Sequence, residues 1–414
     1  MPDQILDAHT SDPVVMGWQQ GLPPAPAKRI SWAEAGHMRF PMHRYAFSNM
    51  REFLPTVRVA RGTGPVWELP LAPRDDLDAV SFTALDDGRT LTWEQSLAEN
   101  FTDAIVVLHK GAIVYERYLG VTRPDSTHIA FSITKSYVGT LAEMLIAEGR
   151  LDPAALIADL IPELAGSGFA DATLRQVLDM TTALDFSEEY TDPNSGIGAF
   201  SMALGLTPRP PGYAGPGDVY GYLPSIAKAG THGERFTYRT CNTEVLGWLV
   251  ARTEGKRLEQ LLSERIWAPL GMEQDADFLI DSTGMPFAGG GLNPVLRDMA
   301  RFGEAMRCDG AGNGGQAIAR EVVAGIKAGG SKAAFAPAGF SYLPDGSYRS
   351  QWWAMPGNHG AFSARGIHGQ AIYIDPVAET VIARFASHPI AANSAIDAAT
   401  LPAFRAMAEH LLQG

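Results

Sequence analysis

The sequence lacks the features of proteins that bind nucleic acids, membranes or metals. Acidic residues outnumber basic ones, 46 against 33, and the net charge of −13 argues against nucleic acid and anionic membranes as partners. No apolar run approaches the roughly 18 residues that a membrane-spanning helix needs. The ten histidines show no paired ligand spacing. We therefore expect neither a metal nor another cofactor.

Cysteine is almost absent. Cys241 and Cys308 are the only two in 414 residues, too few for a disulfide framework and typical of a reducing compartment. The first residues, MPDQILDAHTSDPVVMGWQQ, lack the basic and apolar regions of a secretory signal. These observations predict a cytoplasmic protein.

Two familiar functional motifs are also missing or out of place. No G-x-S-x-G sequence occurs, which argues against an α/β-hydrolase. The segment GAGNGG at 310–315 fits the G-x-G-x-x-G pattern, but it follows a predicted helix instead of a strand. We interpret it as a turn and not as a dinucleotide site.

Hydrophobic patterning predicts strands near both ends of the chain and helices between them. Two β-branched runs in 102–120 flank Lys110-Gly111 and predict a hairpin. Strands return in 340–387, where Asp345-Gly346 is a predicted tight turn, and 395–413 predicts a closing helix. We expect an α/β protein of the α+β type, in which distant antiparallel strands join one sheet flanked by helices.

The same patterning predicts three parts of the chain. Residues 1–60 show little periodicity and predict an irregular N-terminal arm packed on the main body. The α/β domain is predicted to comprise 61–175 and 300–414, with a mostly helical lobe inserted at 176–299.

Ser132 and Lys135 are the strongest candidates for chemistry. They lie one turn apart at the start of a predicted helix, so their side chains can touch. A serine hydroxyl is a weak nucleophile until a base takes its proton, and a buried lysine with a lowered pKa can be that base. The helix start would also aim backbone N–H groups at a developing oxyanion. The alternative is a helix-initiating serine beside a solvated lysine.

A second Ser-x-x-Lys pair, Ser225 and Lys228, has the same spacing. Pro224 precedes it and Ala229-Gly230 follows it, so its helix can hold barely one turn. We expect this copy to have no catalytic role.

Tyr238 is the third candidate, because a phenol beside a lysine can relay a proton to a leaving group. It precedes a predicted amphipathic helix, in a loop position from which it can project into a cleft. The alternative is a packing tyrosine. Cys241 is a rival nucleophile, but no neighbouring histidine supports that role.

Further along the chain, Gly366 and Gly369 interrupt a predicted strand, a pattern typical either of close ligand approach or of a β-bulge. A strand edge there is a candidate source of a second oxyanion donor. Tyr190 and the pair Trp352-Trp353 are candidates for lining a pocket, although paired aromatics often belong to a core.

These segments together resemble the serine β-lactamase and penicillin-recognising superfamily in its class C-like branch, closest to the 6-aminohexanoate-dimer hydrolases and related carboxylesterases. The resemblance spans most of the chain, and its markers occur in the family's order. They are SITK, LRQVLDMTTALDFSEEYTDP, FTYRTCNTEVLGW, GGLNPVLRDMARFG and RGIHGQAIYIDP.

The resemblance implies a β-lactamase/transpeptidase-like fold with the active site between the two lobes. It implies that Ser132 is the acylated nucleophile, Lys135 its base and Tyr238 the catalytic tyrosine. It also implies an oxyanion hole formed by the N–H groups of Ser132 and Ile367. Tyr190, Gly366 and Trp352 are the expected substrate-binding residues.

The sequence departs from the family pattern in several places. Tyr238-Arg239-Thr240 replaces the usual Tyr-x-Asn, with Asn242 two residues further on. Ala364 replaces a lysine that binds the β-lactam carboxylate, and Arg365 is the candidate substitute. Ser201 stands where the oligomer hydrolases carry an acidic residue, and Gly289 lacks the polar side chain of some relatives.

The sequence therefore predicts a serine hydrolase that acts on small carboxylic esters, or on short amides such as 6-aminohexanoate oligomers. A β-lactamase, a penicillin-binding or D-peptidase-like protein, and a non-hydrolytic acylated sensor are the alternatives. The expected partner is a small-molecule ester or amide. The sequence leaves the oligomeric state open, a homodimer included.

Overall fold

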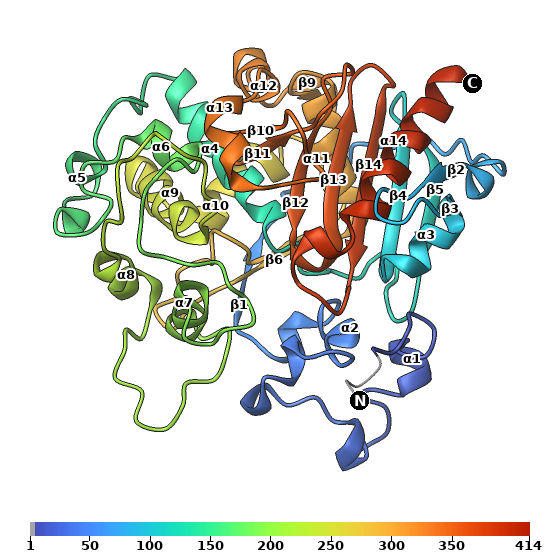
Figure 1. The fold of residues 1–414 in the computed structure, drawn as a ribbon, viewed down its shortest axis with the longest axis horizontal. Coiled ribbons are helices and arrows are strands. Elements are labelled where there is room, and N and C mark those ends of the chain that lie inside the picture. Colours follow the sequence, from blue (N-terminus) through green and yellow to red (C-terminus); the bar gives the residue numbers. More distant parts are fainter. Residues whose placement is uncertain (1–4) are drawn as a thin grey trace.

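The main sheet joins strands from the two ends of the chain. The computed structural model describes residues 5–414, and its seven-stranded antiparallel sheet has the order β10-β11-β12-β13-β14-β4-β5 (Figure 1). The strands are β4 (Thr102–His109), β5 (Ala112–Tyr118), β10 (Ser347–Arg349), β11 (Trp352–Ala354), β12 (Phe362–Gly366), β13 (Gln370–Asp375) and β14 (Thr380–Ala386). β14 pairs with β4, which confirms the predicted sheet built from distant strands.

Helices cover both faces of this sheet, so its central strands are apolar on both sides. Val106 and Leu108 of β4 belong to the core on the face of α4 (Ile133–Ala147) and α11 (Leu296–Arg307). Ile105 and Val107 point to the opposite core, beside α3 (Trp93–Glu99) and α14 (Asp397–Gln413). Continuous apolar runs in the sequence reflect this double burial.

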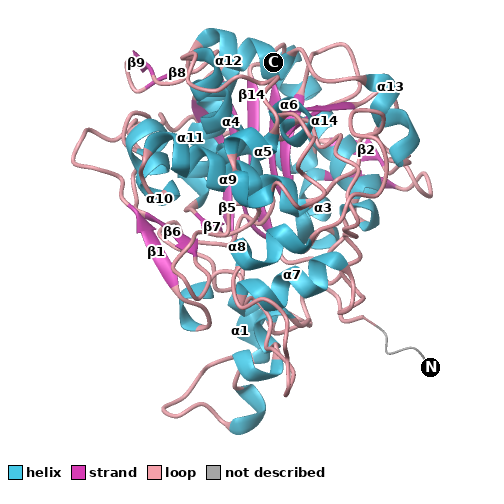
Figure 2. Ribbon diagram, turned by 90° about the vertical axis from the view of Figure 1, so that its left-hand side faces the viewer, coloured by secondary structure: helices cyan, strands magenta, loops and turns pink. Residues whose placement is uncertain are grey.

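The segment between the two halves of the sheet is mostly helical (Figure 2). It contains α5 (Ile157–Leu160), α6 (Leu174–Leu178), α7 (Gly196–Leu204), α8 (Val219–Tyr222), α9 (Thr240–Glu254) and α10 (Leu258–Leu262). β6 (Ala276–Leu279) and β7 (Leu292–Asn293) also lie there, in a small sheet with β1 (Thr56–Val59) from the arm. A strand of the arm thus pairs with the inserted segment.

The remaining α-helices and strands are short. They are α1 (Pro13–Met16), α2 (His43–Ala46), β2 (Ser81–Thr83), β3 (Thr90–Thr92), β8 (Ala311–Gly312), β9 (Gly315–Gln316), α12 (Arg320–Lys327) and α13 (Lys332–Phe335). β8 and β9 form a hairpin, so the glycine-rich segment 310–315 is a turn, as predicted. No helix within 5–414 is both long and apolar enough to cross a bilayer.

The predicted tight turn at Asp345-Gly346 is present: Asp345 has a left-handed backbone, and the Gly346 N–H donates to the Leu343 carbonyl at 3.1 Å. It leads into β10, whereas the β10–β11 hairpin turns at Ser350 and Gln351. Both have left-handed backbones, with φ of 51° and 68°, which the tight hairpin requires. Asp-Gly is the more favoured sequence for a tight hairpin turn. Ser and Gln are less favoured in a left-handed backbone, but side-chain contacts of Ser350 and Gln351 stabilise them in this turn.

The β10–β11 turn packs against α4, which is buried on nearly all sides. Gly139 of α4 makes this approach possible, because a Cβ there would lie 2.4 Å from the carbonyl oxygen of Ser350. One turn earlier, the Ser136 hydroxyl donates to the Gln351 carbonyl at 2.7 Å. The helix face that carries Ser136 and Gly139 thus admits the neighbouring turn.

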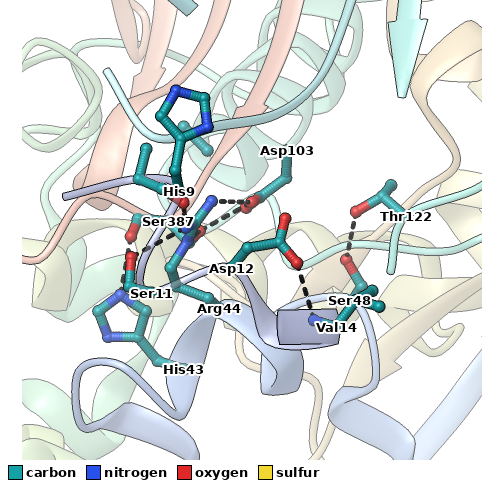
Figure 3. Close-up of polar contacts among 12 residues, drawn as sticks. His9, Ser11, Asp12, Val14, His43, Arg44, Ser48, Asp103, Thr122 and Ser387 are labelled. Carbon is teal, nitrogen blue, oxygen red and sulfur yellow. Dashed lines mark hydrogen bonds and ion pairs between the residues drawn. The ribbon is translucent and has the colours of Figure 1, made fainter. Parts of the chain in front are cut away.

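The N-terminal arm is attached to the body through a buried arginine (Figure 3). Arg44 of α2 donates to the hydroxyls of Ser11 at 3.0 Å and Ser387 at 3.2 Å. Its guanidinium lies 3.6 Å from the carboxylate of Asp103 in β4, and both side chains are almost fully buried. Ser387 also donates to Asp103 at 2.8 Å. Burying this charge is tolerable only because each partner is satisfied.

We expect Arg44→Ala to lower the free energy of unfolding by about 3 kcal/mol, because Asp103 would lose its buried guanidinium partner. Urea denaturation measures the change. Arg58→Ala is the control, since the Arg58 side chain is 70% exposed in its ion pair with Asp275. Its loss should stay below about 1 kcal/mol. Equal losses in the two variants would contradict the importance of the buried contact.

Candidate active site

Ser132 is the N-cap residue of α4, but its side chain does not cap the helix. The preceding residue, Phe131, has a left-handed backbone with φ of 44°, which is costly for a bulky side chain. The Phe131 ring packs edge-on against Phe47 and beside His368, and this packing holds the bend in place. The bend leaves the Ser132 hydroxyl free for another partner.

That partner is Lys135, whose Nζ lies 3.1 Å from Ser132 Oγ. Lys135 is 1% exposed, and its ammonium also donates to the carbonyl oxygen of Gly289. Within residues 5–414 no ion pair joins it to a carboxylate. Burial lowers the pKa of Lys135, while the more distant charges of Glu188 and Glu244 act in the opposite direction. The lowered pKa favours the neutral amine, which is the form that can accept a proton.

Tyr238 lies at the same place, just before α9. Lys135 Nζ is 5.4 Å from the centroid of its ring, and the ring stacks on Trp353 with centroids 5.6 Å apart. Desolvation raises the pKa of the phenol, and its interaction with the Ser132 hydroxyl opposes that shift. A neutral phenol beside the serine is equipped to donate a proton.

The structure therefore brings the three predicted catalytic residues together from α4 and the start of α9. The second Ser-x-x-Lys pair behaves differently. The Ser225 hydroxyl donates to the Tyr222 carbonyl at 2.6 Å, whereas Lys228 pairs with Asp171 at the surface. The two side chains of this copy do not share a hydrogen bond within the described chain.

The end of β12 contacts the start of α4. A Cβ at Gly366 would lie 2.6 Å from the Ala130 carbonyl oxygen and 3.1 Å from the Ser132 nitrogen. Gly366 is thus a close-approach glycine that places the next residue, Ile367, beside the nucleophile. It closes the β12–β13 hairpin, so the strand predicted around Gly366 and Gly369 is in fact two strands. Within residues 5–414 no acceptor takes the Ser132 N–H.

Tyr190 is 37% exposed, and its hydroxyl donates to Glu188 at 2.8 Å. The other carboxylate oxygen of Glu188 accepts the N–H of Thr240 at the start of α9. Tyr190 is thus linked through Glu188 to the helix that follows Tyr238, and a role in substrate binding stays a prediction.

Trp352, another predicted substrate-binding residue, lies in the core and not at the site. It is 1% exposed, its indole N–H donates to Thr140 at 3.2 Å, and it packs against Phe302 and Phe362 in the core. Because successive strand residues face opposite sides of the sheet, its neighbour Trp353 is the one that meets Tyr238. The prediction that Trp352 binds substrate is therefore wrong, because its side chain lies in the core.

Arg365 and Asn242 lie where the sequence departs from the family pattern, and both side chains bind other residues of the protein. Arg365 pairs with Asp397 of α14 and lies over the Trp353 ring, 5.4 Å from its centroid. Asn242 is fully buried, and its amide oxygen accepts the hydroxyl hydrogen of Thr182 at 2.8 Å. Asn242 therefore does not fill the place of the missing asparagine.

Sequence reasoning missed Glu188, Glu244 and the Gly289 carbonyl. A backbone carbonyl has no sequence signal. Glu244 lies one turn beyond Thr240, on a face of α9 that is otherwise buried, and an acidic residue on such a face is the signal that would have found it.

A family model described as "Beta-lactamase" matches residues 94–405. The chain belongs to the β-lactamase family. It is 39% identical over 360 residues to the 6-aminohexanoate-dimer hydrolase of Paenarthrobacter ureafaciens, covering 87% of this chain and 88% of that protein. Membership in the β-lactamase family and this similarity identify the chain as a hydrolase.

Solved structures of other proteins share the fold. A Bacillus anthracis protein assigned as a candidate 6-aminohexanoate-dimer hydrolase has a TM-score of 0.85 and 30% identity, covering 95% of this chain and 99% of that one. A family VIII carboxylesterase has a TM-score of 0.53 and 15% identity, covering 76% and 96%, and shows the fold alone. The predicted fold, antiparallel sheet flanked by helices, is confirmed.

We expect Gly366→Ala to lower the rate of hydrolysis of a chromogenic acyl substrate by about 100-fold, because the new methyl group displaces β12 from Ser132. Steady-state kinetics on the folded variant measures it. Gly325→Ala in α12 is the control, since a Cβ there meets no atom within 4 Å. Wild-type rates for Gly366→Ala would show that this approach is not needed.

Proposed function

We propose that this chain is a serine hydrolase that forms an acyl-enzyme on Ser132 and acts on small carboxylic esters and short linear amides. The observation that carries the proposal is the 3.1 Å contact between Lys135 Nζ and Ser132 Oγ inside a buried site. An amine that lacks a contacting carboxylate and is removed from water is a suitable general base at near-neutral pH.

In the proposed reaction, neutral Lys135 takes the hydroxyl proton of Ser132. Ser132 Oγ then forms a bond to the substrate carbonyl carbon, and the carbonyl oxygen becomes an anion. The N–H groups of Ser132 and Ile367 are the proposed donors to that oxyanion. Such donors act without reorganisation, because the backbone of β12 is fixed against α4 by Gly366.

Tyr238 is proposed to protonate the leaving group as its bond to the carbonyl carbon breaks, and to recover a proton from Lys135. Burial raises the pKa of the phenol and keeps it protonated, so Tyr238 holds a proton that it can give and is not a second base. Water then gives a proton to Lys135 and attacks the acyl carbonyl carbon. The bond from that carbon to Ser132 Oγ breaks, the acid leaves, and Lys135 returns the proton to Ser132 Oγ.

The choice of substrate class rests on two observations. The curated relative at 39% identity is named for an amide dimer, which supports short linear amides beside esters. Arg365, the one candidate for binding a β-lactam carboxylate, is held by Asp397. This pairing argues against β-lactams as the main substrates.

We expect Ser132→Ala to lower p-nitrophenyl ester hydrolysis by at least about 1,000-fold, because no other hydroxyl replaces the nucleophile. Ser225→Ala, the matched substitution in the second Ser-x-x-Lys pair, should retain nearly the wild-type rate. Intact-mass measurement during turnover should detect an acyl adduct on the wild type and none on Ser132→Ala. Equal rates in the two variants would refute the assignment.

We expect kcat/KM for a chromogenic cephalosporin to be about 10- to 100-fold below that for a small ester, because a charged hydrogen bond to the drug's carboxylate is missing. A substrate panel of esters of increasing acyl length, the 6-aminohexanoate dimer and the cephalosporin measures the ranking. A faster reaction with the cephalosporin would favour a β-lactamase. Stable labelling without turnover of any substrate would favour an acylated sensor.

A further inference from the structure

Glu244 of α9 is a buried carboxylate with unusual partners. It is 3% exposed, and it accepts two backbone N–H groups, from Gly289 at 2.6 Å and from Ala288 at 3.2 Å. Within residues 5–414 it forms no ion pair in direct contact. Burying a carboxylate without a contacting cation is costly, and burial raises the pKa of Glu244, so the nearby Lys135 ammonium is the charge that favours its ionised form.

The Gly289 residue connects Glu244 to the catalytic amine. Its N–H donates to Glu244, and its carbonyl oxygen accepts a hydrogen bond from Lys135. A Cβ at this position would lie 2.8 Å from Glu244 Oε1 and 3.3 Å from Lys135 Nζ. The methyl group of Thr240 lies still closer, at 2.6 Å. Carboxylate and amine are therefore both close to the same glycine.

We propose that Glu244 is a positioning residue for the Ser132–Lys135 pair: it fixes the Ala288–Gly289 backbone that directs Lys135 onto Ser132, and its negative charge controls how readily Lys135 releases a proton. This inference rests on the proposed function, in which Lys135 is the base. It assigns Glu244 no contact with the substrate.

The charges around the pair come from several elements. The titratable groups facing Lys135 are Glu188 from the loop before α7, Tyr238 before α9, and Cys241 and Glu244 on α9. Those facing Glu244 are Lys135 on α4, Tyr220 on α8 and Asp281 after β6. Lys135 is the only cation in these two sets. Glu188 and Glu244 therefore both favour the charged form of Lys135, whereas Lys135 is the one cation that acts on Glu244 in these sets.

Burial acts on the two partners in opposite directions. It raises the pKa of Glu244 and lowers the pKa of Lys135, and their mutual attraction opposes both shifts. In a poorly solvated site this attraction is strong. When Lys135 takes the proton of Ser132, the new ammonium is stabilised by the Glu244 carboxylate across Gly289.

The test separates charge from position with two substitutions. Glu244→Gln removes the charge and keeps the size, so Lys135 should lose its proton more easily. The acidic limb of the pH profile of kcat/KM should then move about one unit to lower pH. Glu244→Asp keeps the charge but is too short to hold both N–H groups. Its acidic limb should stay in place while kcat falls about tenfold.

Glu259→Gln is the matched control, because Glu259 is a buried glutamate on α10 that pairs with Arg257. The acidic limb of the pH profile of kcat/KM should not move in this variant. A folded Glu244→Gln variant with the wild-type limb would overturn the proposal. If that variant does not fold, wild-type kcat in Glu244→Asp would overturn it instead. Activity remaining in Ser132→Ala would refute the proposed function itself, whereas these outcomes refute only the role of Glu244.

Discussion

The site depends on one constraint: an amine is kept out of water, and no carboxylate among residues 5–414 contacts it. Lys135 meets a hydroxyl and a backbone carbonyl, and both are neutral acceptors. A contacting carboxylate would hold the ammonium in its charged form, whereas neutral partners leave it ready to exchange a proton. The negative charges of Glu188 and Glu244 act on it from further away.

The fold supplies this environment through the burial of α4. The helix lies between the large sheet and the helical segment, and small residues on one face let the β10–β11 turn approach it. That turn also binds α9, because the Thr243 hydroxyl donates to the Gln351 side chain at 2.8 Å. The helix that carries Lys135 and the helix that follows Tyr238 are thus fixed to the same turn.

Much of this arrangement was predictable. Periodicity located the β4–β5 hairpin and the helix after Ser132, because apolar spacing follows from which faces are buried. The flanking sequence distinguished Ser132 from Ser225, since only the first precedes a helix long enough to be buried. The fold class followed from strands at both ends of the chain.

The failures have physical causes of their own. Trp352 and Trp353 are adjacent residues of the same type, so the sequence does not distinguish them. Only the register of β11 decides which one faces Tyr238. The turn at Ser350-Gln351 is stabilised by tertiary contacts that no local preference reveals. Glu244 acts through the backbone of a residue 45 positions away, so no sequence spacing connects it to Lys135.

Gly289 has an evolutionary consequence. A side chain at 289 would meet the Thr240 methyl group, the Glu244 carboxylate and the Lys135 amine. A homologue that places a side chain there must shorten residue 240 and move or replace the carboxylate at 244, so these positions should vary together. The identity of one residue then predicts whether a relative controls its catalytic amine with a buried anion or with a neutral group.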